Sequence, residues 1–258
     1  MTITSAELAH YADTLLETDA TADYPNALNG IQFENRSTIR GIAAAVDFST
    51  RAIQGALSTS SNLLIVHHGM FWGGLGRLVG PTYERIRALL EADIAVYASH
   101  LPLDRHSELG NNALLAKELG LRATGPFARF GENFIGLRGE TNLPTATLLA
   151  RARSFAQREG GDARASSMAE GRETQRWAMC TGAGASAETL KEARAFGIDT
   201  LIVGEGPHWT AVHAEENDLV IIYAGHYATE TLGVRALAKH LGERFHLPWH
   251  FVDAPTGL

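Results

Sequence analysis

The stretch Leu63-Leu-Ile-Val-His-His-Gly69 decides the fold of this chain. Its four apolar residues form a continuous run, which is typical of a short strand covered on both faces of a parallel sheet. Two adjacent histidines, His67 and His68, follow where the predicted strand stops. In open α/β sheets, ligands bind outside the carboxyl ends of the strands. The stretch therefore predicts a buried parallel strand with a functional site at its end.

Similar apolar runs alternate with helical segments along the rest of the chain. The expected strands lie at 39–46, 63–66, 94–97, 134–137, 177–180, 201–203 and 219–223, and the expected helices at 4–17, 49–58, 81–91, 145–158, 187–196 and 229–244, with another helix ending at Gly120. Thr4 and Glu7 have the spacing of a capping box. The polar segment 160–176 is expected to be an exposed loop or a weak edge element. This alternation predicts the α/β class with mostly parallel sheets.

Two parts of the chain resemble each other. Val96-Tyr-Ala-Ser-His100 is similar to Ile222-Tyr-Ala-Gly-His226, and a second match follows both segments downstream. We interpret this as two similar α/β domains, residues 1–125 and 126–258, with a segment from about residue 225 that could pack back on the first domain. Short matches also arise by chance between βα units, so internal duplication and chance both stay open.

Composition excludes several classes of protein. The chain has 258 residues, 22 Lys and Arg against 29 Asp and Glu, and a net charge of −7, which argues against nucleic acid or an anionic membrane as a partner. Cys180 is the single cysteine, against 11 histidines. No apolar run is long enough to cross a membrane, and the first residues do not resemble a signal peptide. We expect a cytoplasmic protein whose metal ligands, if it has any, are His, Asp and Glu.

Histidines and acids recur where predicted strands end. Asp104 lies four residues after His100, and Glu230 lies four residues after His226. With His67 and His68, the set contains four histidines and two carboxylates. This is more than the three protein ligands that one catalytic zinc needs, so two divalent metals bridged by a carboxylate fit the count better. The ligand types suit zinc, iron, manganese or nickel. The alternative is a set of separate, hydrogen-bonded histidines.

A glycine-rich segment follows the histidine pair. Residues 69–76 include Met70, Phe71 and Trp72. This segment could stack a planar base or close the pocket, and closing the pocket is slightly favoured.

The order of the motifs resembles one known family. The motifs are Asn29-Gly-Ile-Gln32, Val66-His-His-Gly-Met-Phe-Trp72, His100-Leu-Pro-Leu-Asp104, Gly204-Glu205 with His208, and Gly225-His-Tyr-Ala-Thr-Glu230. They are similar to those of the NIF-three-like family of dinuclear metal proteins, whose members are often described as type 2 GTP cyclohydrolase I. The family commonly has proline after the histidine pair and a His-Thr-Asn-Leu-Asp motif, where this chain has Gly69 and His-Leu-Pro-Leu-Asp. The chain therefore looks like a short bacterial branch.

The resemblance implies a set of site residues and an assembly. The implied metal ligands are His67, His68, Asp104, His226 and Glu230, with at least one bridging carboxylate. His100 would be a ligand, would orient Asp104 or would bind substrate. The resemblance also implies a metal site in the cleft between two α/β domains and a ring-shaped homohexamer.

Three functions follow as hypotheses. The leading one is a dinuclear metal-dependent hydrolase of a nucleotide or related heterocycle, in which metal-activated water attacks C8 of guanine and formate is lost, with His100 or Glu205 moving protons. The second is a two-metal phosphoesterase. The third is a metal-binding or scaffold protein without enzymatic activity.

Overall fold

The structure is a computed structural model that describes residues 2–258, and it confirms the α/β class. The chain forms two compact units. The first contains the residues up to Leu103 together with Gly233–Ala254, and the second contains Asp104–Leu232 and Pro255–Leu258. Residue 125, where the sequence analysis divides the chain, lies within the second unit. The long helix α9 (His226–Phe245) contributes its first turns to the second unit and the rest to the first.

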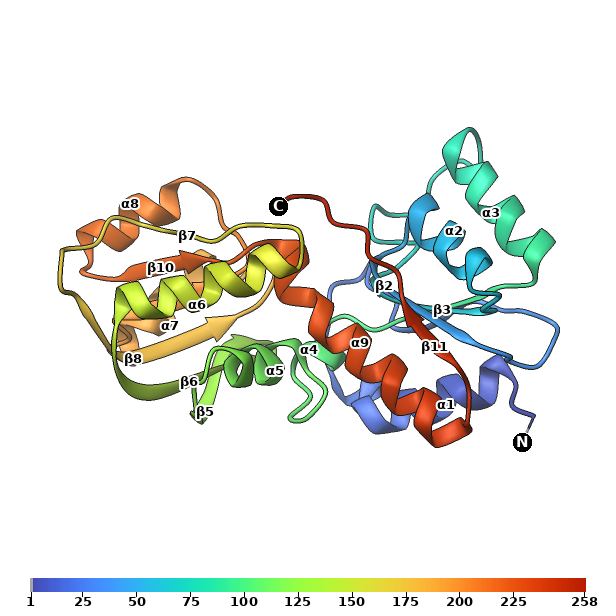
Figure 1. Ribbon diagram of the computed structural model, residues 1–258, viewed down its shortest axis with the longest axis horizontal. Coiled ribbons are helices and arrows are strands. Elements are labelled where there is room, and N and C mark those ends of the chain that lie inside the picture. Colours follow the sequence, from blue (N-terminus) through green and yellow to red (C-terminus); the bar gives the residue numbers. More distant parts are fainter. Residues whose placement is uncertain (1) are drawn as a thin grey trace. The chain divides into compact units, whose positions relative to one another are not determined.

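The first unit is built on a five-stranded sheet (Figure 1). Its strand order is β1 (Gly30–Phe33), β4 (Ala95–Ala98), β3 (Leu63–His68), β2 (Ile42–Asp47), β11 (Trp249–Phe251). Only β1 is antiparallel to its neighbour, β4. The helices are α1 (Ser5–Leu16), the 3-10 turn η1 (Thr18–Ala20), α2 (Thr50–Ser58), α3 (Pro81–Ala92) and the short α4 (Leu101–Asp104), which crosses the boundary between the units.

Helices cover both faces of this sheet. Leu64 and Val66 of β3 pack with Ile53 of α2 and Leu89 of α3 in one apolar cluster. On α1, Asp13 accepts a 2.9 Å hydrogen bond from the hydroxyl of Tyr97 on β4. Both faces of the central strands are therefore buried, as their continuous apolar runs predict.

The second unit is built on a six-stranded sheet. Its strand order is β5 (Ala123–Phe130), β6 (Asn133–Pro144), β8 (Glu173–Cys180), β9 (Thr200–Val203), β10 (Val220–Tyr223), β7 (Arg164–Ala165). Strands β8, β9 and β10 are parallel, whereas β5, β6 and β7 pair antiparallel with their neighbours. The remaining helices are α5 (Asn111–Glu118), α6 (Thr145–Arg158), α7 (Ala187–Ala195) and α8 (Trp209–Glu216).

Strand β8 separates two apolar cores in this unit. Trp177 and Met179 face the core that α5 and α6 cover, and Ala178 and Cys180 face the core that α7 and α8 cover. This alternation follows from the two-residue period of a strand. The buried residues of both cores come from the range 115–228, within the second unit.

Several local expectations are confirmed and others need correction. Thr4 and Glu7 form the predicted capping box at the start of α1. Strand β3 is longer than predicted, because it continues through His67 and His68. Segment 160–176 contains β7 and the start of β8. Strands β1, β5 and β11 and helix α8 were not expected. Among the described residues, no helix has both the length and the apolar character to cross a membrane.

The close approach of β6 to β8 requires glycine at position 136. A Cβ atom added at Gly136 would lie 2.2 Å from the carbonyl oxygen of Met179, whereas one added at Gly76 would meet no atom within 4 Å. We expect Gly136→Ala to lower the free energy of unfolding by about 2 kcal/mol or more, because the backbone of β8 must move. Gly76→Ala should change it by less than about 0.5 kcal/mol. Urea denaturation measures both, and equal midpoints for the two variants would contradict this packing.

Candidate metal centre

Three histidines lie together at the carboxyl ends of β3 and β4. The two strands are parallel, with Val66 opposite Ala98, so His67 and His68 lie beside the residues that follow β4. The ring centroids of His67 and His100 are 4.9 Å apart, and those of His68 and His100 are 5.7 Å apart. One ring nitrogen of each residue lies within 4.8 Å of the others. These residues form the histidine cluster of the first unit, and all three are buried.

Each of these rings is held by a hydrogen bond at Nδ1. His67 bonds the carbonyl oxygen of Ser99 at 2.9 Å, His68 bonds Oδ1 of Asp47 at 2.9 Å, and His100 bonds Oδ1 of Asp23 at 2.8 Å. A ring that donates from Nδ1 to an oxygen keeps its lone pair on Nε2. This outer hydrogen bond is the arrangement that metal-ligating histidines adopt.

A second cluster, which we call the acidic cluster, lies in the other unit and consists of Glu205, His226 and Glu230. His226 begins α9, which follows β10. Its Nδ1 lies 2.8 Å from Oε1 of Glu205, and its Nε2 lies 3.2 Å from Oε2 of Glu230. Glu230 is one turn further along the helix and only 2% exposed. A Cβ atom at Gly182 would lie 2.1 Å from Oε1 of Glu230, so the main chain approaches this carboxylate closely.

Asp104 is a buried carboxylate of the same unit. Its Oδ1 accepts hydrogen bonds from Asn111 Nδ2 at 2.8 Å and from the Thr181 hydroxyl at 3.4 Å. Burial raises the pKa of the Cys180 thiol, and the charges of Asp104 and Glu230 raise it further. Cys180 is therefore a neutral packing residue, as expected from its apolar strand.

The acidic cluster shifts the pKa of its histidine. Burial lowers the pKa of His226, but hydrogen bonds and charge attraction from Glu230 and Glu205 outweigh this effect and raise the pKa to about 9. In the metal-free protein a proton on His226 thus balances part of the buried negative charge. Imidazole and carboxylate donors are ligand types that divalent cations bind, so His226 and Glu230 could help to hold a metal ion in place of that proton.

The predicted site residues come from both units of the chain. His67, His68 and His100 lie in the first unit, and Asp104, Glu205, His226 and Glu230 lie in the second. Sequence reasoning missed the partners Asp23 and Asp47. Asp47 ends β2 directly opposite His68, so an acid at the end of a neighbouring strand was a usable signal. Asp23 lies in an irregular segment before β1, and no sequence signal pointed to it.

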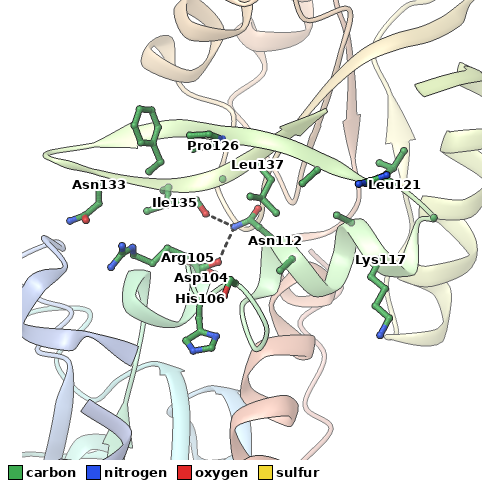
Figure 2. Close-up of a pocket in the computed structure, with 18 of the residues that line it drawn as sticks. Asp104, Arg105, His106, Asn112, Lys117, Leu121, Pro126, Asn133, Ile135 and Leu137 are labelled. Carbon is green, nitrogen blue, oxygen red and sulfur yellow. Dashed lines mark hydrogen bonds between the residues drawn. The ribbon is translucent and has the colours of Figure 1, made fainter. Parts of the chain in front are cut away.

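A pocket of about 830 Å³ in the second unit borders Asp104. It lies between α5 and the β5–β6 hairpin, and Figure 2 shows Asn112 bridging Asp104 and the main chain of β6 through its side-chain amide. Apolar side chains such as Ile135 and Leu137 line it together with three cations, Arg105, Lys117 and Arg122. A pocket of this size and lining suits a small ligand with an apolar part and a negative charge.

The two predicted carboxylate ligands can be tested by metal content. We expect Asp104→Asn and Glu230→Gln each to weaken metal binding at least tenfold, because a neutral amide is a poor substitute for an anionic ligand. Plasma mass spectrometry of the purified variants gives the metal-to-protein ratio. Glu215→Gln, on the exposed surface of α8, is the matched control and should keep the wild-type ratio. Two metals still bound per chain in both test variants would refute the assignment.

The raised pKa of His226 predicts a pH dependence for metal binding. At pH 7 the metal must displace a proton from a group with a pKa of about 9, so affinity should rise with pH and level off near pH 9. The slope approaches tenfold per pH unit below that value. Calorimetric titration with manganese in buffers of different ionisation enthalpy measures both the affinity and the released protons. Glu205→Gln removes one cause of the high pKa and should move the plateau to lower pH, whereas a flat profile would contradict the proposed competition.

The sequence of this chain matches one protein family over almost its whole length. Residues 3–256 match the family described as Duf34/NIF3 (NGG1p interacting factor 3). A relative from Deinococcus radiodurans is 40% identical over 91% of this chain and 88% of its own length, and one from Halobacterium salinarum is 40% identical over 97% of each. Both are named GTP cyclohydrolase 1 type 2 homolog.

Solved structures show the same fold. The protein ybgI, titled as of unknown function, has a TM-score of 0.88 at 33% identity and covers 99% of this chain and 100% of its own. A protein from Thermus thermophilus, TTHA1606, has a TM-score of 0.83 at 33% identity with the same coverage.

Proposed function

Because the chain belongs to the Duf34/NIF3 family, we propose that it is a metal-dependent hydrolase of a nucleotide or related heterocycle, with GTP as the leading substrate. The observation that carries the proposal is the anchoring of four histidines. In His67, His68, His100 and His226, Nδ1 is hydrogen bonded to a carbonyl or carboxylate oxygen. An outer hydrogen bond of this kind orients metal-ligating histidines, and in His100 it orients a ring that lies beside the proposed ligands.

The proposed centre contains two divalent ions, which could be zinc, iron, manganese or nickel. The residues that would hold them are His67, His68, Asp104, His226 and Glu230. When bound, such ions would lower the pKa of water towards 7 and so would provide a nucleophile at neutral pH.

The remaining polar residues are proposed to hold and move protons. Water addition at C8 of guanine, opening of the C8–N9 bond and hydrolysis of the resulting formamide each transfer a proton between oxygen and nitrogen. His100, held by Asp23, is placed beside two proposed ligands. The half-exposed carboxylate of Glu205 holds His226 at Nδ1 and can also exchange protons with solvent. Both residues therefore have the chemistry for proton transfer next to the proposed ligands.

A two-metal phosphoesterase is the second candidate. Arg105, Lys117 and Arg122 line the pocket that borders Asp104, and cations near a metal site are typical of phosphoryl chemistry. The same cations also suit the triphosphate of GTP, so the two candidates differ in the bond broken rather than in the charge of the substrate.

One assay separates the candidates. We expect metal-loaded protein to release formate and a triaminopyrimidine from GTP, whereas phosphate release without formate would replace the cyclohydrolase by the phosphoesterase. A His67→Ala/His68→Ala variant should lose at least a hundredfold in turnover, because two proposed ligands are gone. His10→Ala, an exposed histidine on α1, is the matched control and should retain full activity. Neither product above the level of the double variant would point to a metal-binding protein without this catalytic activity.

Assembly and location complete the proposal. We expect a homohexamer working in the cytoplasm, as the family resemblance and the single cysteine suggest. The mass of the particle in solution, measured by light scattering, tests the number of chains.

A further inference from the structure

We propose that Trp72 and Tyr24 form a stacking surface for a planar heterocycle beside the histidine cluster, an inference that rests on the proposed function and deepens it. Of the two uses left open for the glycine-rich segment, stacking a base or closing the pocket, the structure favours the first. The inference concerns only the first unit, where all the rings involved lie.

The two aromatic rings are continuous with the histidine cluster. The Trp72 ring centroid lies 4.5 Å from that of His100 and 4.9 Å from that of His68. Tyr24 adds a second ring, 6.2 Å from Trp72 and almost perpendicular to it at 79°. Tyr24 also contacts His100, with 5.9 Å between the ring centroids. Because the two rings are almost perpendicular, a planar ligand stacked on Trp72 would meet Tyr24 edge to face and would lie next to two proposed site residues.

Exposure distinguishes the aromatic rings from the histidines. His68 and His100 are 8% and 7% exposed, whereas Trp72 is 37% and Tyr24 is 52% exposed. Trp72 thus covers the histidines with part of its surface and presents the rest to solvent. Closing the pocket does not require an exposed aromatic face. Stacking a ligand does require one, because the ligand must reach the ring.

Gln32 forms hydrogen bonds to both segments that carry the aromatic rings. Gln32 Nε2 donates to the carbonyl oxygens of Ala27 and Leu28, at 2.9 and 3.0 Å, just after Tyr24. Its Oε1 accepts a 2.6 Å hydrogen bond from the main-chain N–H of Met70, two residues before Trp72. The positions of the two rings are therefore coupled before any ligand binds, and such preorganisation lowers the entropy cost of binding.

The geometry also limits the class of ligand. Stacking on aromatic side chains is strong for any base because every base has a π-face, and it gives little discrimination between bases. A sugar phosphate without a base has no such face. The surface should therefore recognise the heterocyclic part of a nucleotide, and other groups must choose among the bases.

The test compares ligands with and without a base. GTP and ribose 5-phosphate are titrated calorimetrically into metal-loaded wild-type protein and into Trp72→Ala. We expect Trp72→Ala to weaken GTP binding about tenfold or more and to leave ribose 5-phosphate binding unchanged. Trp72→Phe should restore most of the affinity, because phenylalanine retains an aromatic face. Trp209→Ala is the matched control, since Trp209 is 44% exposed on α8 of the second unit.

Further readouts separate stacking from a structural role. The metal content of Trp72→Ala should equal that of wild type, and KM should rise far more than kcat falls. Gln32→Ala should also weaken GTP binding while preserving metal content, because it releases both segments. Loss of metal from Trp72→Ala, or GTP affinity equal to that of wild type, would overturn the proposal.

Failure of the inference can be told from failure of the proposed function. Formate release by wild type with unchanged KM in Trp72→Ala would overturn the stacking surface alone. GTP binding that depends on Trp72, without formate release, would support the stacking surface and reject the cyclohydrolase. Absence of GTP binding by wild type would overturn the stacking surface.

Discussion

The parallel register of β3 and β4 is the constraint on which the histidine cluster depends. With Val66 opposite Ala98, the residues that follow are neighbours, and the carbonyl oxygen of Ser99 is in place to bind Nδ1 of His67. A slip of one residue would turn every side chain of β3 to the other face of the sheet. Such a slip would also remove His67 and His68 from the oxygens of Ser99 and Asp47 that bind their Nδ1 atoms. The register of the sheet therefore also determines the geometry of the site.

Charge balance is the corresponding constraint in the second unit. Glu230 and Asp104 are carboxylates at 2% and 6% exposure, and burying an uncompensated charge is costly. Asn111 and Thr181 compensate Asp104 by hydrogen bonds, and protonated His226 compensates Glu230 by charge. This explains why the pKa of His226 is raised although burial alone would lower it. Both His226 and Glu230 are also residue types that could hold a divalent cation in place of that proton.

Much of the fold could be predicted because the central strands are continuous apolar runs. The positions of β2, β3, β8, β9 and β10 and the caps of α1 and α2 follow from local sequence. The edge strands β5 and β11 could not be found in this way, since β5 is mostly exposed and β11 has only three residues. The C-terminal residues 233–254 join the first unit through long-range contacts that no local pattern encodes.

The candidate site shows the same division between local and long-range information. Histidines at strand ends carry a local signal, and all four were identified as site residues. Their hydrogen-bond partners depend on register or on irregular segments. Asp47 could be inferred from the pairing of β2 with β3. Asp23 reaches His100 because the chain between η1 and β1 hydrogen bonds to the residues that follow β4.

Gly69 leaves room for the glutamine that bonds to both segments carrying the aromatic rings. A Cβ atom at this position would lie 2.3 Å from both amide atoms of Gln32, so any larger residue must displace that side chain. Gln32 in turn bonds the segment after Tyr24 and the N–H of Met70. Glycine after the histidine pair is thus part of the arrangement that positions the exposed aromatic rings of this chain.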